Sequence, residues 1–185
     1  LYMEGEALGG LRLLRGVKNR FGSSHEVAIF QMEQHGLSQV DDPSKVLLTQ
    51  RRASTVGSAV IPILEGSRPV LVEIQALTAP THSPVPRRVV NGLDITRVLM
   101  LIATLDRRAG LNLAKQDIIV NVAGGIRVSE PAVDLGVALA VASSLIGLPL
   151  KNNMVVIGEV GLTGEIRIVP QTERRLKEAS RLGLE

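Results

Sequence analysis

Apolar and polar positions alternate through the middle of the chain in the way that β-strands require. The spacing predicts two strands, at residues 57–66 and 68–77, joined by a turn at 65–67. Glu73 and Gln75 alternate with apolar neighbours, so we expect the second strand to have one polar face. The pattern therefore favours an antiparallel pair in which one face covers a core.

Shorter apolar runs predict three further strands. The β-branched run at residues 118–122 indicates a buried strand, residues 87–93 a short strand or sheet edge, and residues 154–157 another strand. A proline-rich stretch at 78–86 predicts a surface loop before the edge strand. Residues 158–166 form a strand pair that turns at Thr163 and Gly164.

Two long stretches have helical character instead. Apolar residues recur every three or four positions from residue 95 to 109, with Asp94 or Thr96 as the cap and Gly110 as the stop. Residues 132–146 are apolar nearly all round, which predicts a buried helix with Ser129 as its N-cap. A last helix is expected over residues 171–182, and one turn over 44–48.

Residues 1–36 do not form a complete domain by these criteria. Two strands are expected there, at residues 12–15 and 27–32. Because two strands are at best marginally stable alone, we interpret this segment as the end of a preceding sheet. The chain starts at Leu1 with no visible signal peptide and has the character of an excised piece. We place the domain boundary between residues 36 and 37.

The strand, small-residue helix, strand and G-E-V-x-L-T-G-E-I run at 158–166 resemble the proteolytic domain of Lon proteases. The resemblance implies an α/β (α+β) domain of the ribosomal protein S5 domain 2-like type over residues 37–185, with a mixed sheet and packed helices. It aligns Gly136 with the family glycine, so that Asp134 replaces the catalytic serine and Glu173 the catalytic lysine. A carboxylate cannot be acylated as a serine can, so we expect no proteolysis and no catalytic residue here.

The first segment carries a closer resemblance. L-L-R-x-V-K-N-R-F-G, followed by E-x-x-x-F-x-M, is similar to the RadA (Sms) family of bacterial recombination proteins. That family's five-residue motif is Lys18, Asn19, Arg20, Phe21 and Gly22, at the end of a RecA-like ATPase core and before a Lon-like domain. The resemblance implies an ATP-driven, DnaB-like branch-migration helicase of recombination, repair and the stress response, working as a hexameric ring.

The same resemblance implies the partners and cofactors of the parent protein. They are DNA without sequence preference, the recombinase RecA, and further copies of the chain, in the bacterial cytoplasm at the nucleoid, with no membrane. ATP or ADP with Mg²⁺, and zinc in an N-terminal zinc finger, belong to parts of the parent outside this chain. We expect no cofactor in the chain itself, because it contains no G-x-x-x-x-G-K-[ST] phosphate loop.

Lys18 and Arg20 suit a nucleotide-coupled role. Side chains two residues apart on an extended segment point the same way. Such a pair could complete a neighbouring subunit's nucleotide site in trans and stabilise charge on the γ-phosphate, as an arginine finger does. The alternative is a solvated turn after a strand.

Charge is concentrated in the middle of the chain. Residues 51–115 carry nine basic and four acidic side chains, whereas the whole chain has a net charge of +3. Arginines are suited to phosphate backbones, which dominate sequence-independent affinity for nucleic acids. The predicted DNA contacts are Arg51, Arg52, Arg68, Arg87, Arg88 and Arg97, with Arg87 and Arg88 preferred. Solubility is the alternative, and Arg107 and Arg108 are explained equally by a helix dipole.

Composition excludes several other classes. There is no cysteine, the three histidines are scattered without metal-ligand spacing, and we expect no metal site. Only 2% of the residues are aromatic, which argues against base stacking. Three alternatives remain: a peptidase with displaced residues such as Ser129 and Lys177, a purely structural ring-former, and a working carboxylate pair of Asp134 and Glu173. For Asp134 we favour hydrogen bonds from an arginine or from backbone N–H groups.

Overall fold

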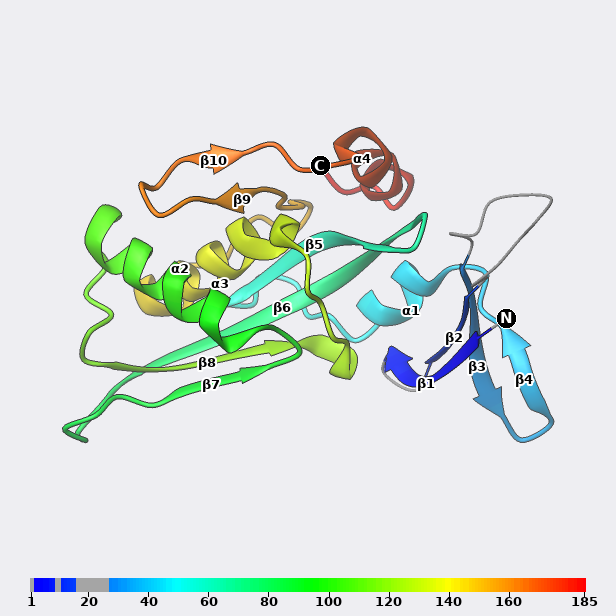
Figure 1. Ribbon diagram of the computed structural model, residues 1–185, viewed down its shortest axis with the longest axis horizontal. Helices are drawn as coiled ribbons and strands as arrows, with labels where there is room; N and C mark the ends of the chain where they lie inside the picture. Colours follow the sequence, from blue (N-terminus) through cyan, green and yellow to red (C-terminus); the bar gives the residue numbers. More distant parts are fainter. Residues whose placement is uncertain (1, 9–10, 16–26) are drawn as a thin grey trace.

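Two four-stranded β-sheets, a two-stranded β-hairpin and four α-helices make up the computed structural model, which describes residues 2–8, 11–15 and 27–185 (Figure 1). The first sheet is antiparallel, in the order β1-β2-β3-β4. Its strands are β1 (Tyr2–Leu8), β2 (Leu11–Arg15), β3 (Val27–Glu33) and β4 (Gly36–Gln39). Sequence reasoning found β2 and β3 and missed the two outer strands. The boundary expected between residues 36 and 37 falls inside this sheet, because β4 pairs with β3.

The second sheet has the order β5-β6-β8-β7. Its strands are β5 (Ser58–Glu65), β6 (Arg68–Pro80), β7 (Arg88–Asn91) and β8 (Gln116–Val122). The pairs β5–β6 and β6–β8 are antiparallel, whereas the edge strand β7 runs parallel to β8. Two parallel strands need a crossover connection, and here a helix between β7 and β8 supplies it. This helix and the helix that follows β8 lie on the same face of the sheet. The molecule is thus mixed α/β with a mixed sheet, as the sequence predicted.

Two helices cover one face of this sheet. They are α2 (Ile95–Arg108), capped by Asp94, and α3 (Asp134–Ile146), which packs on β5 and β6. The close approach of α3 needs a glycine, because a Cβ at Gly136 would lie 2.2 Å from Ile61 Cγ2. Short 3-10 turns, η1 (Ala123–Gly125) and η2 (Pro131–Val133), connect β8 to α3.

The remaining helices and a hairpin lie outside these two layers. The helices α1 (Pro43–Leu48) and α4 (Thr172–Arg181) lie over the other face of the sheet, where Val60, Leu71 and Ala179 form a small second apolar cluster. A short antiparallel hairpin of β9 (Glu159–Val160) and β10 (Ile166–Arg167) lies above α2 and α3 in Figure 1. Within the described residues, no helix is long and apolar enough to cross a membrane.

Three local predictions are wrong. Ser129 does not cap the buried helix, because the 3-10 turn η2 precedes α3 and neither has a side-chain cap. Residues 154–157 form no strand and contribute one parallel bridge, between Val60 and Val155. Glu73 is buried instead of solvated, because the Ser58 hydroxyl donates a hydrogen bond to it. In the last two cases the deciding partner lies outside the local stretch, at Val60 and at Ser58. The Lon-type assignment of residues 37–185 stays a prediction.

Candidate functional site

Asp134 lies at the first turn of α3, where its negative charge is favourable to the helix dipole. Its side chain is only 1% exposed. Arg97 of α2 holds it with two parallel hydrogen bonds, Nε to Oδ1 and Nη2 to Oδ2, each 2.6 Å. The Val160 N–H donates a third bond to Oδ2 at 3.1 Å. The prediction that Asp134 accepts hydrogen bonds from an arginine and from backbone N–H groups is confirmed.

The Arg97–Asp134 pair forms the floor of a cavity of about 320 Å³ between α2 and the β9–β10 hairpin. Hydrogen bonds from Arg97 to Asp134 raise the pKa of the guanidinium. Glu159 lies 3.8 Å from Arg97 Nη2, and Arg167 pairs with both Glu159 and Glu165. The lining residues are Arg97, Met100, Leu101, Thr104, Asp134, Glu159, Val160, Gly161, Leu162, Thr163, Glu165 and Arg167.

This cavity does not bring together the residues of a peptidase. Its lining contains no serine, cysteine or lysine, and the two lining hydroxyls donate elsewhere: Thr104 to the Met100 carbonyl and Thr163 to Glu165. Acyl transfer needs a nucleophile with a base in hydrogen-bond reach. Nothing in the lining supplies that arrangement.

Glu173 lies away from Asp134. Its side chain is 83% exposed on α4 and pairs with Lys177, whose Nζ is 2.9 Å away. It is not among the residues that line the cavity. Ser129 lines two other cavities, neither of which Lys177 lines. The structure therefore assembles neither the carboxylate pair nor the displaced serine–lysine pair that the sequence left open.

Four of the six arginines predicted to bind DNA have guanidinium groups bonded to the protein. Arg97 holds Asp134, and Arg88 donates to the carbonyls of Arg87, Gln116 and Leu113. Arg68 donates to the Asp41 carbonyl, and Arg51 to the Asn152 carbonyl at 2.9 Å. Only Arg52 and Arg87 of the six are exposed.

The loop over residues 109–115 gathers exposed cations at one end of the second sheet. Asp106 accepts the Leu113 N–H at 2.8 Å, Arg88 holds the Leu113 carbonyl at 3.0 Å, and Thr81 donates to the Lys115 carbonyl at 3.0 Å. These bonds fix the end of α2, the loop and the start of β7 to one another, and Figure 1 shows them at the same end. The exposed cations there, which we call the basic end, are Arg87, Arg107, Arg108 and Lys115.

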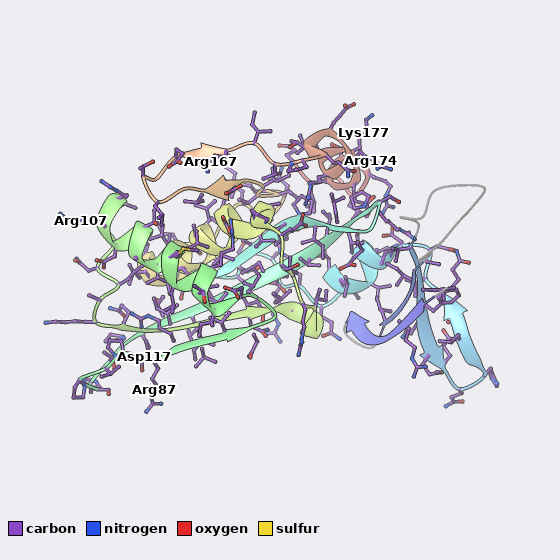
Figure 2. All side chains as sticks on the ribbon, in the orientation of Figure 1. Arg87, Arg107, Asp117, Arg167, Arg174 and Lys177 are labelled. Atoms are coloured by element: carbon purple, nitrogen blue, oxygen red, sulfur yellow. The ribbon has the colours of Figure 1, made fainter. Side chains whose placement is uncertain are left out.

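Arg87 is oriented through its backbone. Its N–H donates to Asp117 Oδ1 at 2.7 Å, and this bond lowers the pKa of that carboxyl. Figure 2 shows Arg87 and Asp117 beside each other, with Arg107 at the outer end of α2. Sequence reasoning counted Arg107, Arg108 and Lys115 in the basic segment but could not see how the fold distributes them. Arg107 lies at the outer end of α2, apart from Arg87 in Figure 2, and Arg108 lies against Gly164 of the β9–β10 turn.

Two predictions are not addressed by these contacts. The motif Lys18, Asn19, Arg20, Phe21 and Gly22, with its nucleotide-coupled role for Lys18 and Arg20, lies outside the described residues. In the described ranges, 2–8, 11–15 and 27–185, no three His, Asp or Glu side chains converge as a metal site requires.

Comparison with known proteins gives the family. Over 183 residues, 99% of this chain, the sequence is 49% identical to proteins named DNA repair protein RadA from Halalkalibacterium halodurans and Bacillus subtilis. It is 50% identical to the protein of that name from Pseudomonas aeruginosa. This chain belongs to the RadA family. The chain spans 40% of the length of each of these RadA proteins.

A second similarity covers the C-terminal half. A family model described as subunit ChlI of Mg-chelatase matches residues 95–185, which run from α2 to the end of the chain. These residues hold the Arg97–Asp134 pair, its cavity and three of the four cations of the basic end. The RadA relatives reported above agree with the resemblance found in the motifs.

Proposed function

We propose that this chain is part of a RadA-type DNA repair protein: an ATP-driven, DnaB-like helicase that promotes branch migration during recombination. In this proposal the chain contributes DNA contact and a ring scaffold, and no peptidase activity. The family membership supports the repair role. The cavity supports the absence of peptidase chemistry, since a bidentate ion pair occupies the place where a nucleophile would stand.

ATP hydrolysis with Mg²⁺, and zinc binding, fall to parts of the parent outside this chain. Lys18 and Arg20 would reach a neighbouring subunit's nucleotide in a hexameric ring, and RecA would be a partner at the DNA. In this proposal the protein works in the bacterial cytoplasm at the nucleoid. These statements extend the family resemblance.

The exposed basic end is the observation that carries the DNA-binding part of the proposal. Its four cations project from segments that are hydrogen-bonded to one another, so little ordering of the backbone is needed on binding. Phosphate contacts of this kind give affinity without sequence preference. In this scheme Arg88 fixes the neighbouring loop through its hydrogen bonds and does not contact DNA. The other arginines whose guanidinium groups bond to the protein do not contact DNA either.

Fluorescence anisotropy with labelled single- and double-stranded DNA across a salt series tests this. Each phosphate contact contributes about −0.9 to the slope of log K against log salt for duplex, and about −0.7 for single strands. We expect the combined Arg87→Ala, Arg107→Ala, Arg108→Ala and Lys115→Ala variant, which removes four contacts, to make the slope shallower by about 3 for single strands and about 4 for duplex. The matched control removes four exposed cations elsewhere: Arg127, Lys151, Arg174 and Lys177.

The outcome separates two functions. Equal slopes for the two variants would move the DNA path away from the basic end. No binding by the unmodified chain at low salt would leave the chain as a ring scaffold, which is the structural alternative.

A further inference from the structure

The cavity beside the Arg97–Asp134 pair contains a carboxylate that the fold itself does not use. Glu159 of β9 lies 3.8 Å from Arg97 Nη2 and 4.0 Å from Arg167 Nη1, beyond hydrogen-bond distance of both. Among the residues that the structure describes, no donor is hydrogen-bonded to this carboxylate. Its side chain is 33% exposed and lines the cavity. Both oxygens of Glu159 can therefore accept hydrogen bonds from a molecule in the cavity.

Arg97 places donors next to these acceptors. Its Nε and one Nη2 hydrogen are bonded to Asp134, and these two bonds fix the plane of the guanidinium. A guanidinium carries five N–H donors, so three remain, one on Nη2 and two on Nη1. Within the described part of the chain, none of these three has a hydrogen-bond acceptor. The cavity thus presents a fixed donor and a carboxylate that lie side by side without bonding to each other.

The Watson–Crick edge of guanine matches this arrangement. It carries an acceptor, O6, followed by two donors, N1–H and the N2 amino group. Two parallel hydrogen bonds to the Glu159 carboxylate and one from Arg97 to O6 would satisfy all three groups of the base. The corresponding edges of adenine, cytosine and thymine can give a carboxylate only one such bond. A trans peptide group cannot bridge the two side chains, because its N–H and C=O point in opposite directions.

The walls of the cavity are suited to the flat faces of a base. Arg97, Met100 and Thr104 follow one another on the same face of α2, at spacings of three and four residues. Met100 is 42% exposed on this wall, and Leu162 is 64% exposed on the wall formed by the hairpin. A base between α2 and the hairpin would cover both side chains. The volume of about 320 Å³ lies at the small end of the range for ligand pockets, which favours a single nucleotide.

An exposed arginine borders the cavity where α2 and the hairpin meet. Arg108 follows Thr104 by four residues, so it lies one turn further along the same side of α2. A Cβ added to Gly164, in the hairpin turn, would lie 3.4 Å from Arg108 Cβ. The Arg108 side chain is exposed. A guanidinium at this position is suited to the phosphate of a nucleotide whose base occupies the cavity.

We propose that this cavity binds a guanine nucleotide, with Glu159 and Arg97 on the base and Arg108 on the phosphate. The groups that are recognised are the same in a free nucleotide and in an unpaired guanine of a DNA strand. The inference goes beyond the DNA contact proposed above, which involves phosphates alone.

Isothermal titration calorimetry of the chain with GMP, IMP and AMP tests the contacts to the base. The base of IMP lacks only the N2 amino group, and that of AMP has a different edge. We expect GMP to bind about 5- to 150-fold more tightly than either, which is the discrimination that one bidentate base contact gives. Glu159→Gln should remove most of this preference. Glu173→Gln, at an exposed position on α4, is the matched control and should leave it unchanged.

Arg108→Ala tests the contact to the phosphate. This variant should weaken the binding of GMP several-fold and leave the binding of guanosine, which has no phosphate, unchanged. Circular dichroism checks that each variant is folded. Three results would overturn the proposal: no binding of GMP, equal affinity for GMP and AMP, or an unchanged preference in the Glu159→Gln variant.

Short single strands distinguish the two sources of guanine. Anisotropy compares a strand of thymines with the same strand containing one guanine. Tighter binding of the second strand, removed by Glu159→Gln, would support an unpaired DNA guanine in the cavity. Equal binding of the strands, with GMP still preferred over AMP, would support a free nucleotide.

The same measurements separate this inference from the DNA contact. A chain that binds DNA without any preference for GMP over AMP keeps the DNA contact and overturns the guanine site. A chain that prefers GMP but binds neither strand keeps the guanine site and removes the DNA contact.

Discussion

Replacing Arg97 by alanine tests whether this arginine serves the fold or the DNA. The change leaves the Asp134 carboxylate, 1% exposed, with the Val160 N–H as its remaining hydrogen-bond donor. Breaking a buried ion pair by removing one partner costs about 3–5 kcal/mol. Arg97 is 30% exposed and water can reach the carboxylate through the cavity, so we expect about 2–3 kcal/mol.

Urea unfolding followed by circular dichroism measures this loss. For a chain of this size a loss of 2–3 kcal/mol corresponds to a fall in Tm of roughly 4–12 °C. Arg107→Ala, on the same helix but exposed, is the matched control and should change stability by less than about 0.5 kcal/mol. The double variant with Asp134→Ala should show a coupling energy above about 1 kcal/mol.

DNA binding by the same variant discriminates between the two roles. If Arg97 is structural, the salt dependence of DNA binding by Arg97→Ala keeps the slope of the unmodified chain. A stability within about 0.5 kcal/mol of the unmodified chain, together with a slope shallower by about 0.7–0.9, would refute the structural reading. It would restore Arg97 as the DNA contact that the sequence predicted.

Two further predictions concern ion pairs that hold α4 to the rest of the molecule. Hydrogen bonds from Arg181 lower the pKa of Asp42 from 3.8 to about 2, so their stabilisation is present above pH 4 and is lost as the pH falls toward 2. The stability difference between the unmodified chain and Arg181→Ala should therefore shrink between pH 5 and pH 2, and a constant difference in urea midpoint would contradict this. Arg175, 1% exposed, bonds Glu130 and the carbonyls of Pro62 and Pro170. Glu130→Ala should cost about 3 kcal/mol in thermal unfolding. The exposed Glu173→Ala should cost under about 0.5 kcal/mol, and equal losses would rule the argument out.

Local pattern determined most of the secondary structure. The strands β5, β6 and β8 follow from alternation and β-branched runs, and α2 follows from its three-to-four spacing with Asp94 as the cap. These features depend on neighbours within a few residues, which is the range over which periodicity carries information. The five-residue motif and the G-E-V-x-L-T-G-E-I run identified the family, because each consists of consecutive residues and can be recognised without knowing the fold.

The candidate site depended on partners far apart in the chain. Arg97 and Asp134 are separated by 37 positions, and no spacing rule could predict that they meet. The same holds for Arg88. The carbonyls of Leu113 and Gln116, 25 and 28 residues away, accept hydrogen bonds from Arg88, whereas its equally basic neighbour Arg87 is exposed. A charge count cannot separate a bonded arginine from a free one.

The amino-acid sequence by itself thus determined the family, the mixed α/β class and the excess of basic residues in the middle of the chain. Only the tertiary structure decided which of the six predicted arginines bond to the protein itself, and that the Asp134 carboxylate is paired with Arg97. The physical reason is that propensity and periodicity are local. Burial, ion pairing and surface composition arise only when distant segments are brought into contact.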